Sequence, residues 1–172
     1  FQSHRKCWQE ILDRGLEAAL IIEDDVDIIN REFMAAVKLA MKEIKMGDLI
    51  RFPIKLREKP RNKFVMRENI SIFEPTLVGL GMVAQIVTFD AARRLLEQTE
   101  RFDRPVDTYL QLRWKHGVRI LTLWPNGVRE ISSILGGSLI QGKSNGDRLR
   151  REILRPLYRA KLSTYAFINK QK

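Results

Sequence analysis

The sequence predicts a single α/β domain built on a mixed, Rossmann-like sheet flanked by helices. An apolar run at 18–22 follows a segment with helical spacing, which is typical of a strand buried on both faces of a sheet. A second helix and strand follow at once, and beyond residue 60 the pattern becomes that of a hairpin-rich half. With 172 residues and 44% hydrophobic composition, the chain is long and apolar enough for one compact core.

The first half of the chain alternates between the two kinds of element. Apolar side chains recur every three or four positions in 7–16, which predicts a helix before the strand at 18–22. Asn30 is expected to cap a second helix, whose apolar positions lie in 33–44. Residues 48–53 are a second strand that ends at a proline.

The second half has shorter apolar segments. The expected elements are a hairpin of 64–66 and 70–73, a strand at 82–88, a helix capped by Asp90, a helix from Asp107 to about Lys115 and a strand at 118–123. His116 is expected at a solvated helix end, where it has no assigned role.

Positive charge is concentrated at the end of the chain. The net charge is +10, and Glu152 is the only acidic residue in 148–172. We therefore expect a main domain over 1–146 and a basic amphipathic helix over 147–172, with a polyanionic partner. The helix could be simply solvated, dock its apolar stripe on the core, or lie on an anionic membrane surface. Nucleic acid is not expected, because no recognised motif supports it.

The chain's compartment can be addressed from its cysteine content. Cys7 is the single cysteine and cannot form an internal disulfide, which favours a reducing compartment. The longest apolar run is too short to cross a bilayer, and no signal peptide is visible after Phe1.

An acidic run follows the most apolar strand. Ligands of such sheets bind beyond the carboxyl ends of parallel strands, which is where Glu23, Asp24 and Asp25 should lie. Adjacent carboxylates repel one another, and Mg²⁺ or Mn²⁺ would relieve that repulsion. On an extended backbone Glu23 and Asp25 share a side, so they are the expected metal ligands, and Asp24 would contact ribose or a backbone amide. The alternative is a polar exit from the strand.

Three stretches of sequence carry a family resemblance. They are Ser3-His4 with Trp8 and the run AALIIEDDV at 18–26, the alanine-containing segment 92–96, and the Pro-x-Asp element in 104–107. Together they resemble glycosyltransferase family 25, the lipooligosaccharide galactosyltransferases with collagen-modifying relatives. The likeness spans roughly residues 3–133.

The resemblance implies a GT-A-type fold and transfer of a hexose, often galactose, from a UDP-sugar to a lipopolysaccharide core or related glycan. It also implies Mn²⁺ or Mg²⁺ at the acidic run and a cytoplasmic location beside the inner membrane. Relatives carry a strand–helix–strand unit before the Ser-His element, so a chain that opens at Phe1 is expected to be a fragment. Two departures are Ala84-Gln85 in place of a Gly-Tyr pair, and Val128-Arg129-Glu130 in place of a glutamine.

The resemblance also directs attention to Asp107, Ser3 and His4. Asp107 is the expected general base for an acceptor hydroxyl, and helix capping is its alternative role. Ser3 and His4 begin a helix and are expected to meet donor phosphate or sugar, although Ser3 is also an ordinary N-cap. A different class of function stays open: a catalytically silent module that binds glycan or anionic lipid on the same scaffold.

Overall fold

The computed structural model describes residues 1–67, 69–130, 158, 160–162, 164 and 165. These residues form a six-stranded sheet in the order β1-β6-β3-β7-β5-β4 and a separate pair, β2-β8. The strands of the large sheet are β1 (Ala18–Ile22), β3 (Asp48–Arg51), β4 (Pro60–Arg67), β5 (Ile70–Pro75), β6 (Ala84–Thr88) and β7 (Arg119–Trp124). The prediction of a single mixed α/β domain is confirmed.

Strand directions place several chain segments at one end of the sheet. Strand β3 is parallel to β7 and antiparallel to β6, and β6 is antiparallel to β1. Strands β1, β3 and β7 therefore point the same way, and their carboxyl ends lie beside the amino end of β6. We call this the carboxyl end of the sheet.

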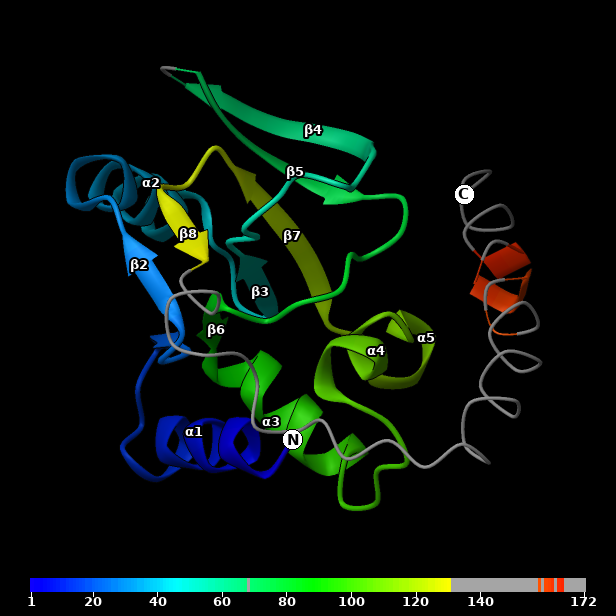
Figure 1. Cartoon of the computed structure of the whole chain (residues 1–172). Coiled ribbons are helices and arrows are strands. Elements are labelled where there is room, and N and C mark those ends of the chain that lie inside the picture. The colour runs from blue at the N-terminus through cyan, green and yellow to red at the C-terminus, as the bar shows by residue number, and fades with distance from the viewer. Residues whose placement is uncertain (68, 131–157, 159, 163, 166–172) are drawn as a thin grey trace.

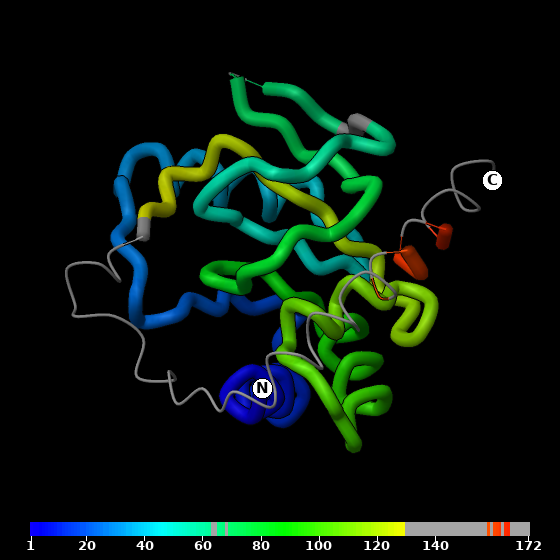
Figure 2. Tube along the Cα trace, turned by 45° about the vertical axis from the view of Figure 1, so that its right-hand side comes forward, coloured from blue at the N-terminus to red at the C-terminus, as the bar shows by residue number. Residues whose placement is uncertain are grey.

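Helices cover both faces of the sheet (Figure 1). On one face, α1 (Gln2–Asp13), α3 (Phe89–Gln98) and α4 (Val106–Leu110) contribute to a core that includes Leu49 and Ile120. Helices α1 and α3 lie side by side there, in Figure 2 as in Figure 1. On the other face, α2 (Asn30–Glu43) packs on Ile50 and Leu121. Because successive residues of β3 face opposite sides of the sheet, the adjacent Leu49 and Ile50 are both buried, each in a different core.

Helices α1 to α4 have N-caps other than the polar residues that the sequence offered for capping. The N-cap positions of α1 to α4 are held by Phe1, Ile29, Thr88 and Pro105. Asn30 and Asp90 were the predicted caps, and capping was the alternative role of Ser3 and Asp107. The backbone is still extended at Ile29, Thr88 and Pro105, which is the conformation that defines a cap. The polar residues lie in the first turn instead, where the negative charges of Asp90 and Asp107 interact favourably with the positive end of the helix dipole. The capping prediction was therefore wrong in position.

A small two-stranded sheet was not predicted. Strand β2 (Val26–Ile28) follows the acidic run and pairs antiparallel with β8 (Val128–Glu130). Asn126 shapes the turn before β8: its amide donates to the Pro53 carbonyl at 2.9 Å, and its Oδ1 accepts from the Val128 N–H at 2.9 Å. The pairing places the chain that leaves the acidic run beside the chain that leaves β7.

The opposite end of the sheet carries a paired charge. Asp48, at the start of β3, is 1% exposed and lies opposite Arg119 at the start of β7. The Arg119 guanidinium donates from Nε to Asp48 Oδ1 at 2.7 Å and from a terminal nitrogen to Oδ2 at 2.5 Å. The hydrogen bond to Asp48 raises the pKa of Arg119. This two-pronged contact joins the neighbouring parallel strands.

His116 is buried, which corrects the prediction of a solvated helix end. It closes α5 (Arg113–His116) and is 3% exposed, because the αL turn at Gly117 folds the chain back over it. Its Nε2 lies 3.2 Å from the Leu110 carbonyl, and its Nδ1 accepts from the Val118 N–H at 3.1 Å. Both contacts suit a neutral imidazole with the proton on Nε2. Burial lowers the pKa of His116 to about 4 from its ordinary 6.5.

This histidine should make stability depend on pH. The unfolded chain binds a proton at this ring below pH 6.5, whereas the folded chain does so only near pH 4, so the stabilisation is present above pH 6.5 and is lost as pH falls toward 4. We expect the wild type to lose about 3 kcal/mol more unfolding free energy than His116→Gln over this window. Urea unfolding of both proteins across the window measures the difference. Parallel pH curves would contradict the prediction.

The described residues near the chain end are helical and touch α4 and α5. The Tyr158 hydroxyl donates to the Thr108 carbonyl at 3.0 Å and lies 2.9 Å from Gln111 Oε1. Leu162 is buried against Tyr109 and Leu112. For these side chains, docking on the domain is what the structure shows. The rest of the predicted basic helix lies outside the described residues, and among those described no helix is long and apolar enough to span a membrane.

Candidate active site

The acidic run lies at the carboxyl end of the sheet, as predicted, but on a turn. Glu23, Asp24 and Asp25 join β1 to β2, and the Glu23 N–H donates to the Val83 carbonyl at 2.8 Å. Asp24 is exposed, while Glu23 and Asp25 are half-buried. The chain is not extended here, so strand alternation does not explain their orientation. The orientation of Glu23 and the orientation of Asp25 have different causes.

Glu23 is held by a histidine from the first helix. Its Oε1 lies 3.2 Å from His4 Nε2, and His4 Nδ1 lies 3.1 Å from Gln85 Nε2. With the Gln85 amide donating to Nδ1, the His4 proton is on Nε2 and points at Glu23. Both ring nitrogens are thus engaged, and His4 is 8% exposed. This arrangement orients the carboxylate, as histidine–carboxylate pairs do beside metals.

Asp25 presents a buried oxygen that has no partner. Its Oδ1 is shielded from solvent and accepts no hydrogen bond within the described part of the chain. Buried polar atoms are nearly always paired, so an unpaired carboxylate oxygen points to a group that binds there. Asp25 directly precedes β2, whose pairing with β8 fixes the turn. A cation or a donor group from a ligand would satisfy this oxygen.

A row of buried polar side chains crosses the sheet at this end. Gln85 pairs with Ile21 on one side and Arg51 on the other, and Arg51 pairs with Thr122. Paired residues share a face, and one step down the strands the row on that face is apolar: Ala19, Val87, Leu49 and Ile120. The change from an apolar to a polar row marks the end of the core.

Unpaired polar atoms gather at the same place. Among the described residues, the buried side-chain polar atoms without a partner are Trp8 Nε1, Asp25 Oδ1, Arg51 Nε, Glu58 Oε2, Gln85 Oε1 and Thr122 Oγ1. All except that of Trp8 belong to residues at or beside the carboxyl end of the sheet. Such groups are costly in a packed interior, and their concentration here is the strongest structural sign of a functional site.

Asp107 is tied to a loop at this end. Its Oδ2 accepts from the Gly81 N–H at 3.0 Å, and its Oδ1 accepts from its own helix at Thr108 N–H, 2.7 Å away. Residues 78–83 lead into β6, so the hydrogen bond brings α4 against the sheet end. The side chain is half-buried, which leaves it accessible to a ligand.

A small hollow with basic residues adjoins the same loop. It has a volume of about 160 Å³ and is lined by Pro53, Ile54, Lys55, Arg57, Leu80, Gly81 and Val83. Gly81 donates to Asp107 and Val83 accepts from Glu23, so the hollow is linked by single hydrogen bonds to both acidic groups. Its size suits a diphosphate or one sugar ring rather than a whole nucleotide sugar. Sequence reasoning missed Lys55 and Arg57, since a basic pair in a loop has no distinctive spacing.

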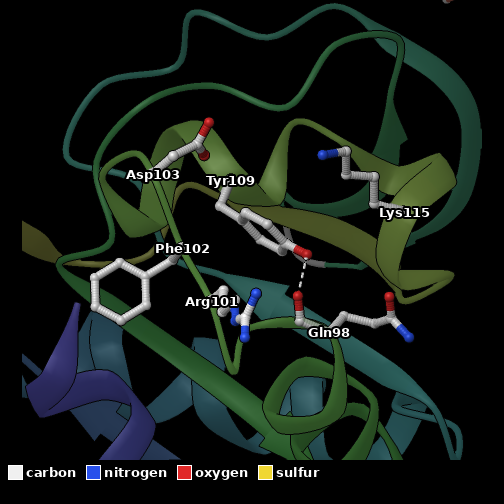
Figure 3. A pocket seen from close by; sticks show the side chains of 6 residues that line it. All are labelled: Gln98, Arg101, Phe102, Asp103, Tyr109 and Lys115. Carbon is white, nitrogen blue, oxygen red and sulfur yellow. Dashed lines mark hydrogen bonds between the residues drawn. The ribbon is translucent and has the colours of Figure 1, made fainter.

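A wider hollow lies elsewhere and is shown in Figure 3. It has a volume of about 530 Å³ and is lined by Gln98, Arg101, Phe102, Asp103, Tyr109 and Lys115. Tyr109 is two residues beyond Asp107 in α4, a rotation of roughly 200°, and its hydroxyl donates to the Gln98 carbonyl at 2.6 Å. The hollow therefore faces away from the loop that binds Asp107. It contains none of the unpaired buried atoms, so we place the site at the carboxyl end of the sheet.

The structure brings most of the predicted site residues to that end, with Ser3 in a different position. His4 contacts Glu23, and Asp25 lies on the same turn as Glu23. Separate hydrogen bonds join Glu23 and Asp107 to the segment 78–83. Ser3 is exposed within α1.

The side chains available as ligands decide whether a metal ion fits here. No group of three or more His, Cys, Asp or Glu side chains is arranged to hold an ion among the described residues. Mg²⁺ commonly uses one or two carboxylates together with substrate phosphates and water. Glu23 and the unpaired oxygen of Asp25 fit that incomplete set, provided that a phosphorylated ligand completes it.

Fold and site together define a mixed α/β protein. The carboxyl end of its sheet carries acidic side chains and unpaired buried polar atoms, and a hollow with basic residues lies next to it. The family model of glycosyltransferase family 25, described as an LPS biosynthesis protein, matches residues 1–110. Because that match covers more than half of the 172 residues, the chain belongs to this family. Membership implies a glycosyltransferase of lipopolysaccharide biosynthesis, with a nucleotide-sugar donor and a glycan or lipid acceptor. No curated protein matches the chain.

The His4 contact leads to a prediction about metal affinity. Replacing His4 with alanine frees Glu23, and we expect Mn²⁺ affinity measured in the presence of UDP to fall by about 10- to 100-fold. Gln9→Ala, on the exposed part of the same helix, is the control. Titration calorimetry measures both. If His4→Ala instead weakened UDP binding equally with and without Mn²⁺, His4 would be a direct donor contact.

Proposed function

We propose that this chain carries the catalytic centre for transfer of a hexose, galactose first among the candidates, from a UDP-sugar to a lipopolysaccharide core or related glycan. The observation that carries the proposal is the gathering of unpaired buried polar atoms and acidic side chains at the carboxyl end of the sheet. Ligands of open α/β sheets bind there. Family membership supplies the reaction class.

The residues of the site divide the work of a direct displacement. Glu23 and Asp25 would hold Mn²⁺ or Mg²⁺, whose charge neutralises the leaving diphosphate. Lys55 and Arg57 line the adjacent hollow and would add positive charge beside the phosphates. Asp24, which is exposed on the turn, would contact the ribose. Ser3 is assigned to the donor side on family likeness alone.

Asp107 is the proposed general base. The acceptor oxygen forms a bond to the anomeric carbon, the bond from that carbon to the diphosphate oxygen breaks, and the acceptor proton passes to the Asp107 carboxylate. Attack from the face opposite the leaving group inverts the anomeric carbon. The Gly81 and Thr108 N–H groups fix the carboxylate's direction before the acceptor arrives.

The proposal includes a GT-A-type fold and a cytoplasmic location beside the inner membrane. The mixed sheet with helices on both faces supports the fold assignment. The net charge of +10, concentrated in 148–172, supports attraction to an anionic membrane surface that carries a lipid-linked acceptor.

A silent binding module is the second candidate. It is favoured by one observation, that both Asp107 oxygens already accept backbone hydrogen bonds, as a purely structural carboxylate would. Titration calorimetry with UDP-galactose and UDP-glucose, with and without Mn²⁺, separates the two functions, and a transfer assay with lipopolysaccharide core completes the test. Mn²⁺-dependent binding followed by turnover supports the enzyme. Glycan binding with no affinity for either UDP-sugar supports the silent module.

A further inference from the structure

The loop that binds Asp107 is held by a buried ion pair. Arg51, the last residue of β3, is 1% exposed and forms an ion pair with Glu58, which is 7% exposed. Neither side chain can reach bulk solvent, and nothing in the reaction proposed above uses them. A buried pair of this kind is an uncertain contributor to stability, because desolvating both charges costs about as much as their attraction returns.

Arg51 and Glu58 both form hydrogen bonds with residues 79–81 of this loop. The Arg51 guanidinium donates to the Gly81 carbonyl at 2.6 Å and lies 3.3 Å from the Leu80 carbonyl. Glu58 accepts from the Gly79 N–H at 2.6 Å through the same oxygen that binds Arg51. Successive loop residues are therefore bound by two charged groups that are themselves bound to each other.

The close fit at Gly79 shows how tightly the loop is seated. A Cβ added there would lie 2.9 Å from Glu58 Oε1, a distance that real side chains do not adopt. Glycine is needed because the carboxylate approaches the backbone itself. Gly81, two residues on, turns with a φ of +89° and directs its N–H at Asp107.

We propose that Arg51 and Glu58 are positioning residues for the transfer reaction: they clamp residues 79–81, and through the Gly81 N–H they fix the direction of the Asp107 carboxylate. This inference rests on the proposed role of Asp107 as general base. The geometry that carries it is a continuous path from Arg51 to the Gly81 carbonyl, and from the N–H of the same residue to Asp107. Gln111 braces the loop at its start by donating to the Val78 carbonyl at 2.6 Å.

Arg51→Lys tests the clamp without removing its charge. Lysine has no planar fork, so it cannot bind Glu58 and the Gly81 carbonyl together. We expect kcat to fall about tenfold with the donor KM within about twofold, since misdirection of the base affects the chemical step and not donor binding. Amide hydrogen exchange at Gly79 and Gly81 should accelerate in the same variant.

A matched control lies at the other end of the same strand. Asp48→Asn breaks the paired contact with Arg119, and it should lower stability while leaving kcat and exchange at Gly81 unchanged. If Arg51→Lys does not fold, Gly79→Ala provides the second variant, because its Cβ would collide with the Glu58 side chain and so disturb the contact between the ion pair and the loop without removing either charge.

A double variant decides whether Arg51 acts through Asp107. Arg51→Lys combined with Asp107→Asn should be no slower than Asp107→Asn alone, because a base that is absent cannot be misdirected. The clamp would be overturned if the two substitutions lowered kcat by factors that multiply, or if amide hydrogen exchange at Gly81 were unchanged in Arg51→Lys. A normal kcat in Asp107→Asn would instead refute the proposed base, and exchange at Gly81 and Thr108 would still report on the clamp.

Discussion

Replacing Asp25 with alanine is expected to abolish Mn²⁺-supported transfer, with kcat/KM lower by about 1,000-fold, or about 4 kcal/mol. The buried Oδ1 of Asp25 has no partner of its own, so its proposed role is to bind a cation together with a substrate phosphate. Without it, Glu23 alone would face the charge that develops on the leaving diphosphate.

The measurement needs the substitution, a nearby control and a readout other than turnover. Asp27→Asn is the control, because Asp27 is also acidic, lies two residues on and is exposed, with Oδ1 bound to its neighbour's N–H at 2.9 Å. Transfer to lipopolysaccharide core is followed across a Mn²⁺ series, and Mn²⁺ binding in the presence of UDP is measured by calorimetry. Undiminished turnover and Mn²⁺ affinity in Asp25→Ala would reject the metal role.

Replacing Asp107 with asparagine is expected to lower kcat by about 100- to 10,000-fold, the range that positioned general bases contribute. Asparagine keeps an oxygen that can accept from the Gly81 N–H, so the loop should stay in place while the proton acceptor is lost. Donor binding should be unaffected, because the carboxylate acts on the acceptor hydroxyl.

A second aspartate near the start of α4 provides the comparison. Asp103 is exposed and pairs with its neighbour Arg104, so Asp103→Asn should keep full activity. Steady-state kinetics of both variants, with UDP-sugar binding measured separately, distinguish lost chemistry from lost affinity. A silent scaffold would show no transfer in the wild type, whereas a different base would leave Asp107→Asn active.

The sequence was sufficient for the architecture and for the location of the acidic run. Strand β1 was predicted with its observed bounds because its apolar residues are contiguous and polar residues flank them. The small sheet β2-β8 was missed because a three-residue strand carries too little periodicity, and its partner lies about a hundred residues away. Pairing at that separation depends on tertiary structure.

The supporting groups of the site were beyond sequence reasoning. Gln85 looked like a departure from the family pattern, yet the structure makes it the partner of His4. The sequence analysis assigned no role to Arg51 or Glu58, and only the fold shows that both are buried and form an ion pair. His116 was misjudged because the burial of a helix end depends on what packs over it. For Gln85 and Arg51, the contacts to His4 and Gly81 come from distant segments of the chain.

Strand β3 has an ion pair at each end: Asp48 pairs with Arg119, and Arg51 pairs with Glu58. A slip of β3 by two residues along β6 and β7 would keep each side chain on its own face of the sheet, but it would move Leu49 and Ile50 out of the two apolar cores. The same slip would leave the buried charges of Asp48 and Arg51 without their partners. Core packing and the two ion pairs therefore select the same alignment of β3, and this alignment sets how far the carboxyl end of the sheet stands from the core.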